Sequence, residues 1–185
     1  MTSDGIGSGF LPEAYIVARP ETLNRCIVAD ITIRRHNGEF GDWAALHRLL
    51  HQAFASMEDR IDPPSSLHRM TPETLREKAR AESLLLAFSG SQLVGCGFGA
   101  VINNLLYLSK LAVDPAHQRR GILRKLVTEF GEDARQRGLV GLCLQTRIEL
   151  IENHATFQAL GFSKSAETAH PGFDRPTSFT FRKMF

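Results

Sequence analysis

The stretch LSKLAVDPAHQRRGILRKLV, residues 108–127, carries the most information about the fold. Residues 108–113 are mostly apolar and predict a strand that ends at Asp114 and Pro115. From Gly121 onward, apolar residues recur at helical spacing, which predicts an amphipathic helix that ends at Gly138. The sequence therefore predicts a strand, a short basic turn and a helix in direct succession.

The basic turn predicts a binding site for a diphosphate. The first N–H groups of a helix have no partner inside the helix, and the helix dipole adds partial positive charge there. Arg119, Arg120 and Arg124 add full charges, and Gly121 permits close approach of the backbone. A solvated helix start is the alternative, but basic side chains there oppose the dipole, so a bound anion explains them better. The spacing differs from that of the glycine-rich loops of nucleotide-binding proteins, which argues against an NTPase or a Rossmann dehydrogenase.

Working outward toward the N-terminus, residues 83–88, 93–102 and 105–113 read as three strands joined by short turns, an antiparallel meander. Before them, residues 31–35 alternate as a strand does. Asp42 is a plausible N-cap for a helix whose apolar stripe runs from Trp43 to Met57. Thr71 and Pro72 begin a second helix.

Toward the C-terminus, residues 140–148 predict a strand and residues 153–160 a short helix that Gly161 ends. Two strands follow, on either side of a turn at 169–176. The order of strands and helices indicates an α+β fold, with a mixed central sheet of about six or seven strands flanked by about four helices.

Length and composition fit one globular domain. The chain has 185 residues, of which 43% are hydrophobic and 23% are charged. We expect the domain to span residues 31–185, after an extension over residues 1–30 that has no sustained periodicity. Gly5, Gly7 and Gly9 in this extension do not predict a nucleotide loop, because no strand precedes them and no amphipathic helix follows directly.

Charge and cysteine content narrow the function classes. The net charge is +2, from 22 basic and 20 acidic residues without a long block of one sign, which argues against nucleic acid or a membrane surface as the main partner. Cys26, Cys96 and Cys143 show no CxxC spacing, so neither a disulfide framework nor a metal site is expected. No signal-peptide pattern or long apolar segment is present, and the expected location is cytoplasmic.

Two motifs resemble those of the GCN5-related N-acetyltransferase (GNAT) superfamily. QRRGIL at 118–123, after AVDP at 112–115, resembles the acetyl-CoA loop Q/R-x-x-G-x-G/A of that family. NHATFQALGF at 153–162 resembles its C-terminal N-x-x-A-x-x-F/Y-x-x-x-G-F segment. With the order of elements, the resemblance covers roughly residues 31–185 and implies the GNAT fold, with acetyl-CoA as co-substrate.

The resemblance also implies which residues bind that co-substrate. Backbone groups of three strand residues would face the pantetheine arm, with one N–H polarising the thioester carbonyl, and the basic turn would hold the diphosphate. Asn153 would bond to the arm, although from sequence alone it is equally an N-cap. The implied positions are Leu111, Ala112, Val113, Gln118, Arg119, Arg120, Gly121, Ile122, Leu123, Arg124, Asn153 and Phe157.

Two of these positions depart from the family pattern. Leu123 stands where the family uses Gly or Ala, so its side chain either joins the apolar stripe of the helix or crowds the co-substrate. Phe157 stands where many members have a tyrosine thought to protonate the leaving thiolate, and a phenyl ring cannot donate a proton.

The candidate catalytic residues are Tyr107 and Glu149. By resemblance, Tyr107 holds the position of the glutamate base of histone-type members. A phenol is a poor base at neutral pH but can act as an acid or orient an amine, and the alternative is a half-buried strand tyrosine. Glu149 and Glu152 could relay a proton through water, or they could simply complement a helix dipole. His170 reads as a surface loop residue rather than a base.

These observations predict an enzyme that acetylates an amine by direct attack on the thioester, with no covalent enzyme intermediate. By family analogy, the loops at 57–70 and 169–176 border the acceptor site. Their mixed charges do not choose between a small-molecule amine and a protein amino group, and the sequence leaves a homodimer open. The alternative is a non-catalytic acyl-CoA-binding or regulatory module, since the usual tyrosine and strand carboxylate are both missing.

Overall fold

The computed structural model describes residues 30–185, and its strands and helices follow the predicted order. The strands are β1 (Ile31–Arg35), β2 (Ser83–Ser89), β3 (Gln92–Ile102), β4 (Leu105–Val113), β5 (Gly141–Arg147), β6 (Ser163–Thr168) and β7 (Ser178–Met184). The α-helices are α1 (Trp43–Phe54), α2 (Pro72–Ala81), α3 (Ile122–Gln136) and α4 (Ile151–Ala159). Three 3₁₀ turns are η1 (Ala55–Met57), η2 (Ser66–Arg69) and η3 (Pro115–His117).

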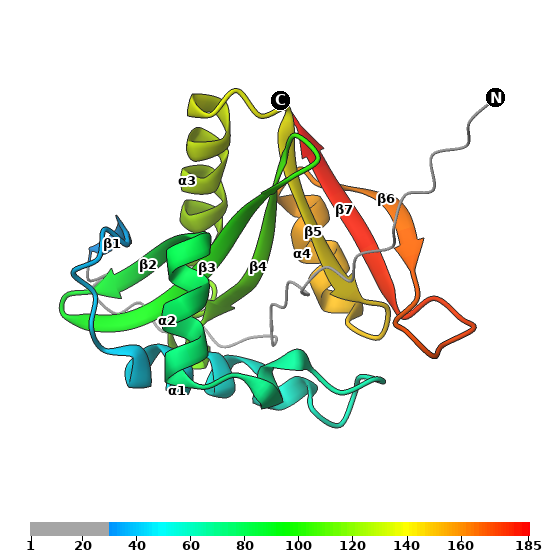
Figure 1. Ribbon diagram of the computed structural model, residues 1–185, viewed down its shortest axis with the longest axis horizontal. Coiled ribbons are helices and arrows are strands. Elements are labelled where there is room, and N and C mark those ends of the chain that lie inside the picture. Colours follow the sequence, from blue (N-terminus) through cyan, green and yellow to red (C-terminus); the bar gives the residue numbers. More distant parts are fainter. Residues whose placement is uncertain (1–29) are drawn as a thin grey trace.

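The seven strands form one mixed sheet in the order β1-β2-β3-β4-β5-β7-β6 (Figure 1). All neighbours are antiparallel except β4 and β5, which are parallel because α3 carries the chain back along the sheet between them. The predicted α+β architecture is therefore confirmed. The expectations for the extension, including those for Gly5, Gly7, Gly9 and Cys26, lie outside the described residues.

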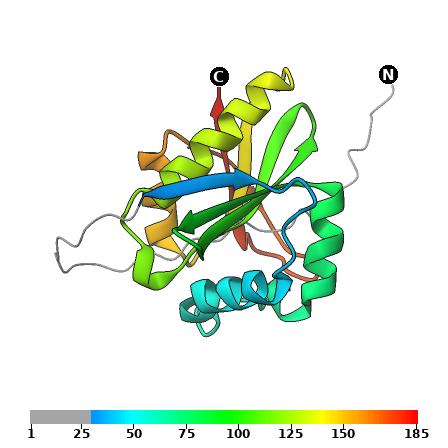
Figure 2. The same cartoon turned by 90° about the vertical axis from the view of Figure 1, so that its left-hand side faces the viewer.

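Alternation along the strands produces a core on each face of the sheet. Leu106, Leu108 and Leu111 of β4 pack with the apolar stripe of α3 and with α4, whereas Cys96 and Phe98 of β3 pack with α1 and α2. Figure 2 shows α1 and α3 on opposite sides of the sheet. Each helix thus buries one apolar face against strands that are themselves covered on both sides.

Side-chain caps fix the starts of the first two helices as predicted. The Asp42 carboxylate accepts a hydrogen bond from the N–H of Ala45, and Thr71 and Thr74 form a reciprocal capping box at α2. The start of α4 is a correction. The helix begins at Ile151 rather than at 153, because buried Leu150 anchors the preceding turn without a polar cap. Asn153 is therefore inside the helix, and the N-cap interpretation of this residue is wrong.

A bulge distorts β4 just before its last residues. The register between β3 and β4 shifts between Cys96 and Phe98, and Lys110 on β4 has a φ of 51°. Gly97 lies inside this shift. A Cβ there would lie 2.7 Å from Leu111 Cδ2 and 2.9 Å from Phe130 Cε2, so only glycine lets α3 approach the sheet this closely.

The parallel pairing of β4 with β5 is short. It runs from Leu106 opposite Leu142 to Leu108 opposite Leu144 and then stops. Figure 1 shows the two strands moving apart toward their carboxyl ends. We call this opening, between residues 109–113 of β4 and residues 145–147 of β5, the β4–β5 split. The carboxyl ends of parallel strands are where open α/β sheets bind ligands.

Candidate functional site

The turn between β4 and α3 has the backbone expected of an anion site. Arg119 and Gly121 both have left-handed conformations, with φ values of 63° and 74°. Gly121 is the N-cap of α3 and offers no side-chain cap, so the first N–H groups of the helix are left for another acceptor. Asp114 holds the other end of the turn, with its carboxylate accepting from the N–H of Ala116 and 2.7 Å from His117 Nδ1.

A cavity of about 350 Å³ opens at this helix start. Seven of its lining residues were predicted to bind the co-substrate: Val113, Gln118, Arg119, Gly121, Ile122, Leu123 and Arg124. The other three, Thr156, Ala159 and Leu160, come from α4 and the residue after it, and the sequence reasoning missed them. Helical spacing from Asn153 could have found Thr156 and Leu160, since positions three and seven residues further on share its face, and Ala159 lies three residues beyond Thr156.

Leu123 contacts both the core and the cavity, the two environments that the sequence left open for its side chain. Its side chain is half-buried and packs against the core beneath α3, and it also lines the cavity. The departure from the family pattern therefore narrows the cavity while stabilising the helix that forms it.

Several buried polar atoms on α4 and on the two strands of the β4–β5 split lack hydrogen-bond partners. Asn153 is fully buried, and neither its Oδ1 nor its Nδ2 has a partner. Ser109 Oγ and Thr146 Oγ1, one on each side of the split, are also buried without a hydrogen-bond partner. An unsatisfied buried amide costs about 1–3 kcal/mol. A ligand that offered amide and carbonyl groups to these atoms would remove this cost.

Other predicted binding residues lie around the cavity rather than in its lining. Leu111 and Ala112 are buried on β4, and Arg120 is exposed at the turn. Phe157 is fully buried in the core, 5.9 Å from the Phe162 ring centroid. Its ring thus contributes packing.

Tyr107 is buried next to the split. It lies opposite Cys143 in the short parallel pairing and packs with Leu105, Cys143 and Ile102. At 1% exposure it is more buried than the half-buried strand tyrosine that the sequence suggested. The thiols of Cys96 and Cys143 are buried too, and burial raises the pKa of each. Neither is therefore suited to act as a nucleophile.

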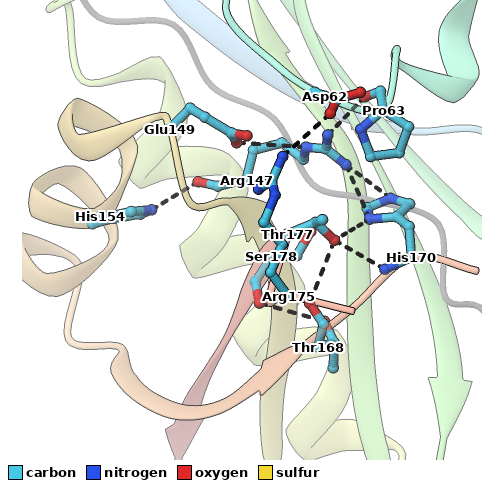
Figure 3. Close-up of polar contacts among 10 residues, drawn as sticks. All are labelled: Asp62, Pro63, Arg147, Glu149, His154, Thr168, His170, Arg175, Thr177 and Ser178. Carbon is cyan, nitrogen blue, oxygen red and sulfur yellow. Dashed lines mark hydrogen bonds and ion pairs between the residues drawn. The ribbon is translucent and has the colours of Figure 1, made fainter. Parts of the chain in front are cut away.

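Arg147, at the end of β5, is a buried charged residue near the predicted acceptor loops that the sequence reasoning missed (Figure 3). Its side chain is fully buried. Nη2 donates to the carbonyl oxygen of Pro63 at 2.7 Å, Nη1 lies 2.9 Å from His170 Nε2, and Nε lies 3.8 Å from Glu149 Oε2. An arginine that ends an otherwise uncharged strand was the available signal.

His170 is buried, so its interpretation as a surface residue is wrong. Burial and the positive charge of Arg147 lower the pKa of His170 to about 4, so the ring is neutral at pH 7. Thr177 Oγ1 also contacts the ring, as Figure 3 shows. The neutral imidazole can accept a hydrogen bond from Arg147 and is too weakly basic to serve as a general base.

The loops that carry Pro63 and His170 lie side by side. Arg175 pairs with Asp62 across them at 3.2 Å, and Arg60 pairs with Glu152 of α4, which lowers the pKa of that carboxylate. Glu152 is thus held ionised by Arg60. Glu149 has a side chain 25% exposed, and its Oε2 accepts no hydrogen bond.

Comparisons with known proteins agree on the fold. The family model described as "Acetyltransferase (GNAT) family" matches residues 43–162. A search of curated protein sequences gave no match. In addition, no helix within residues 30–185 is long and apolar enough to cross a membrane.

Three solved structures illustrate the likeness. PaiA N-acetyltransferase from Thermoplasma acidophilum, in complex with coenzyme A, is 18% identical, with a TM-score of 0.70, over 84% of this chain and 99% of that one. The ribosomal-protein-S18-alanine N-acetyltransferase from Escherichia coli is 19% identical, with a TM-score of 0.61, over 84% and 94%. A GNAT acetyltransferase from Elizabethkingia anophelis with acetyl-CoA bound is 16% identical, with a TM-score of 0.60, over 84% and 98%. From the family match over most of the described residues, the chain belongs to the acetyltransferase (GNAT) family.

Proposed function

We propose that this protein transfers the acetyl group of acetyl-CoA to the amino group of an acceptor, by direct attack of the neutral amine. The observation that carries the proposal is the cavity at the start of α3, with two arginines in its lining and the unpartnered amide of Asn153 close by in α4. Family membership gives the acetyltransferase class, and the geometry supports the choice of co-substrate.

The residues present fit acetyl-CoA. The first N–H groups of α3, together with Arg119 and Arg124, match the charge and size of a diphosphate. The Asn153 amide and the split between β4 and β5 suit an extended arm with amide groups. When bound, acetyl-CoA supplies an acetyl thioester, and a backbone N–H among residues 111–113 would polarise its carbonyl.

The proton movements fall to Glu149 and Tyr107 in this proposal. Glu149 Oε2 accepts no hydrogen bond and lies 3.8 Å from Arg147 Nε, so this carboxylate can accept a proton from the amine, directly or through water. Tyr107 supplies the nearest phenol on β4, where it orients the amine or protonates the departing thiolate. Phe157, held in the core, supplies neither function.

The test is turnover. Full-length protein with acetyl-CoA and a panel of small amines and peptides should release free CoA and yield the acetylated amine, and calorimetry should show CoA binding. The alternative, a non-catalytic acyl-CoA-binding module, is favoured by the buried Phe157. CoA binding without acetylation of any amine would establish that alternative, and absence of CoA binding would exclude both.

A further inference from the structure

A second cavity lies between the two loops that the family analogy assigns to the acceptor site. It has a volume of about 570 Å³ and opens between the loop at 63–69 and the loop at 170–171. Pro63, Ser65, Ser66, Arg69 and His170 contribute to its lining. No residue of this cavity lines the one at the start of α3.

Two buried cations lie at the walls of this cavity. Lys110, at the bulge of β4, is 1% exposed, and its Nζ donates to Ser66 Oγ at 2.8 Å. Arg147 lies behind the opposite wall, where its guanidinium contacts Pro63 and His170. The exposed side chain of Arg69 adds a third positive charge to the lining.

The described carboxylates nearby engage mainly other arginines. Asp62 pairs with Arg175, and Glu152 pairs with Arg60. Glu149 lies near Arg147, at 3.8 Å. Among the described residues that line the cavity, Arg69 is the one with a permanent charge, and His68 lies 3.8 Å from Glu58. Because the two inner cations are buried, their field is screened less than that of surface charges.

The position of Lys110 connects this cavity to the proposed reaction. Lys110 directly precedes Leu111, whose backbone borders the β4–β5 split. Lys110 therefore joins the Ser66 wall of the cavity to the segment of β4 that borders the split.

We propose that the acceptor is a small amine that also carries a carboxylate, which this cavity binds through Arg69 and the serine hydroxyls, with the buried charge of Lys110 behind Ser66. The proposal rests on the proposed acetyltransferase function and names its substrate class. Arg147 acts as a positioning residue, since it joins the two loops that form the walls. The same charges disfavour polycationic amines, whose further ammonium groups would face Lys110 and Arg69.

The experiment compares matched acceptors with the full-length chain at saturating acetyl-CoA. Amino acids are paired with their amides, phosphoethanolamine with ethanolamine, and spermidine is included. An amide lowers the pKa of the neighbouring amine and so raises its neutral fraction, which means that any preference for the acid runs against intrinsic reactivity. We expect kcat/KM to be at least about tenfold higher for the carboxylate member of a pair.

Variants show whether residues of this cavity cause the preference for carboxylate amines. Arg69→Gln should raise KM for the carboxylate amines several-fold and leave the amides unchanged, and Lys110→Met should do so more strongly. Arg76→Gln, which removes an exposed arginine from α2, is the matched control. Because Arg69 is exposed, its variant should fold even if Lys110→Met does not.

Each outcome decides a separate question. Carboxylate preference that Arg69→Gln reduces and Arg76→Gln keeps supports the proposal. Acetylation without that preference, or a preference for spermidine or for the phosphate-bearing amine, overturns the substrate class and leaves the proposed function standing. Failure to acetylate any amine while CoA binds overturns the proposed function itself.

Discussion

Tyr107 is the residue for which the proposed mechanism makes the most direct kinetic prediction. Its phenol is buried beside the end of the β4–β5 pairing, where Phe157 cannot supply a proton. Removing a general acid lowers turnover by about 10² to 10⁴. We expect Tyr107→Phe to lower kcat at least roughly tenfold and to leave CoA affinity nearly unchanged, as measured by steady-state kinetics and calorimetry. If Tyr107→Phe turned over as fast as the parent protein, the phenol would have only a structural role.

Asn153 gives a prediction in which stability and binding move in opposite directions. Its buried amide has no partner, so Asn153→Leu, which keeps the shape and removes the polar atoms, should stabilise the ligand-free protein by about 1 kcal/mol. The same change should weaken CoA binding by roughly tenfold. Urea unfolding with and without CoA measures both effects. A less stable variant with unchanged CoA affinity would show that the amide serves the fold.

Leu123 gives the complementary case, because its side chain packs on the core and lines the cavity. Leu123→Gly should lower the free energy of unfolding by about 1–3 kcal/mol, through lost burial and lower helix propensity. Leu123→Ala separates the two causes, since alanine keeps the propensity. Tighter CoA binding in either variant would show that the leucine also crowds the co-substrate. A variant of unchanged stability that binds CoA more weakly would contradict both roles.

At the residue scale, local chemistry decided what the sequence could predict. The basic turn and Asn153 could be proposed as binding residues because their neighbours along the chain form recognisable motifs. Arg147 was not found, because its contacts with Pro63 and His170 join residues 84 and 23 positions away. No local pattern reports such pairings. The burial of His170 was missed for the same reason.

Among the elements, α3 concentrates the positive charge of the proposed CoA site. Arg119 and Arg124 line the cavity at its start, whereas Arg135 near its end pairs with Glu132. CoA affinity should therefore weaken several-fold between about 50 and 500 mM salt, since the Debye length shortens from above 10 Å to a few Å. Arg124→Gln should flatten this dependence in calorimetric titrations, and Arg135→Gln should not. Affinity indifferent to salt would argue against an electrostatic site.

The elements themselves were largely predictable from periodicity and caps. Asp42, Thr71 and Pro72 marked helix starts that side-chain hydrogen bonds confirm. The start of α4 was placed two residues late, because a buried leucine replaces a polar cap there and leaves no such signal. The bulge at Lys110 was also unpredicted, since it depends on how β3 pairs with β4.

For the molecule as a whole, His170 couples folding to pH. Its pKa falls from 6.5 to about 4 on folding, so between these values the unfolded chain binds more protons. Stability should be full above pH 6.5, fall as the pH drops through this window, and level off below about pH 4. The contribution of His170 is at most about 3 kcal/mol. Urea midpoints from pH 7 to pH 4 measure it.

The matched control is His170→Gln, which removes the titrating group. The pKa of His51 is also lowered, mainly by burial, so some acid sensitivity should remain in this variant. A slope identical to that of the parent would show that His170 contributes nothing.

The short pairing of β4 with β5 also divides the backbone pairing of the sheet into two ladders. The strands from β1 to β4 hold together through long antiparallel ladders, and β5, β6 and β7 form a second ladder of their own. Between them, backbone pairing spans only Leu106–Leu108 and Leu142–Leu144. The β4–β5 boundary is therefore where neighbouring strands of the sheet pair over the fewest residues. A molecule bound between β4 and β5 would contact both ladders, and so would connect the two halves of the sheet.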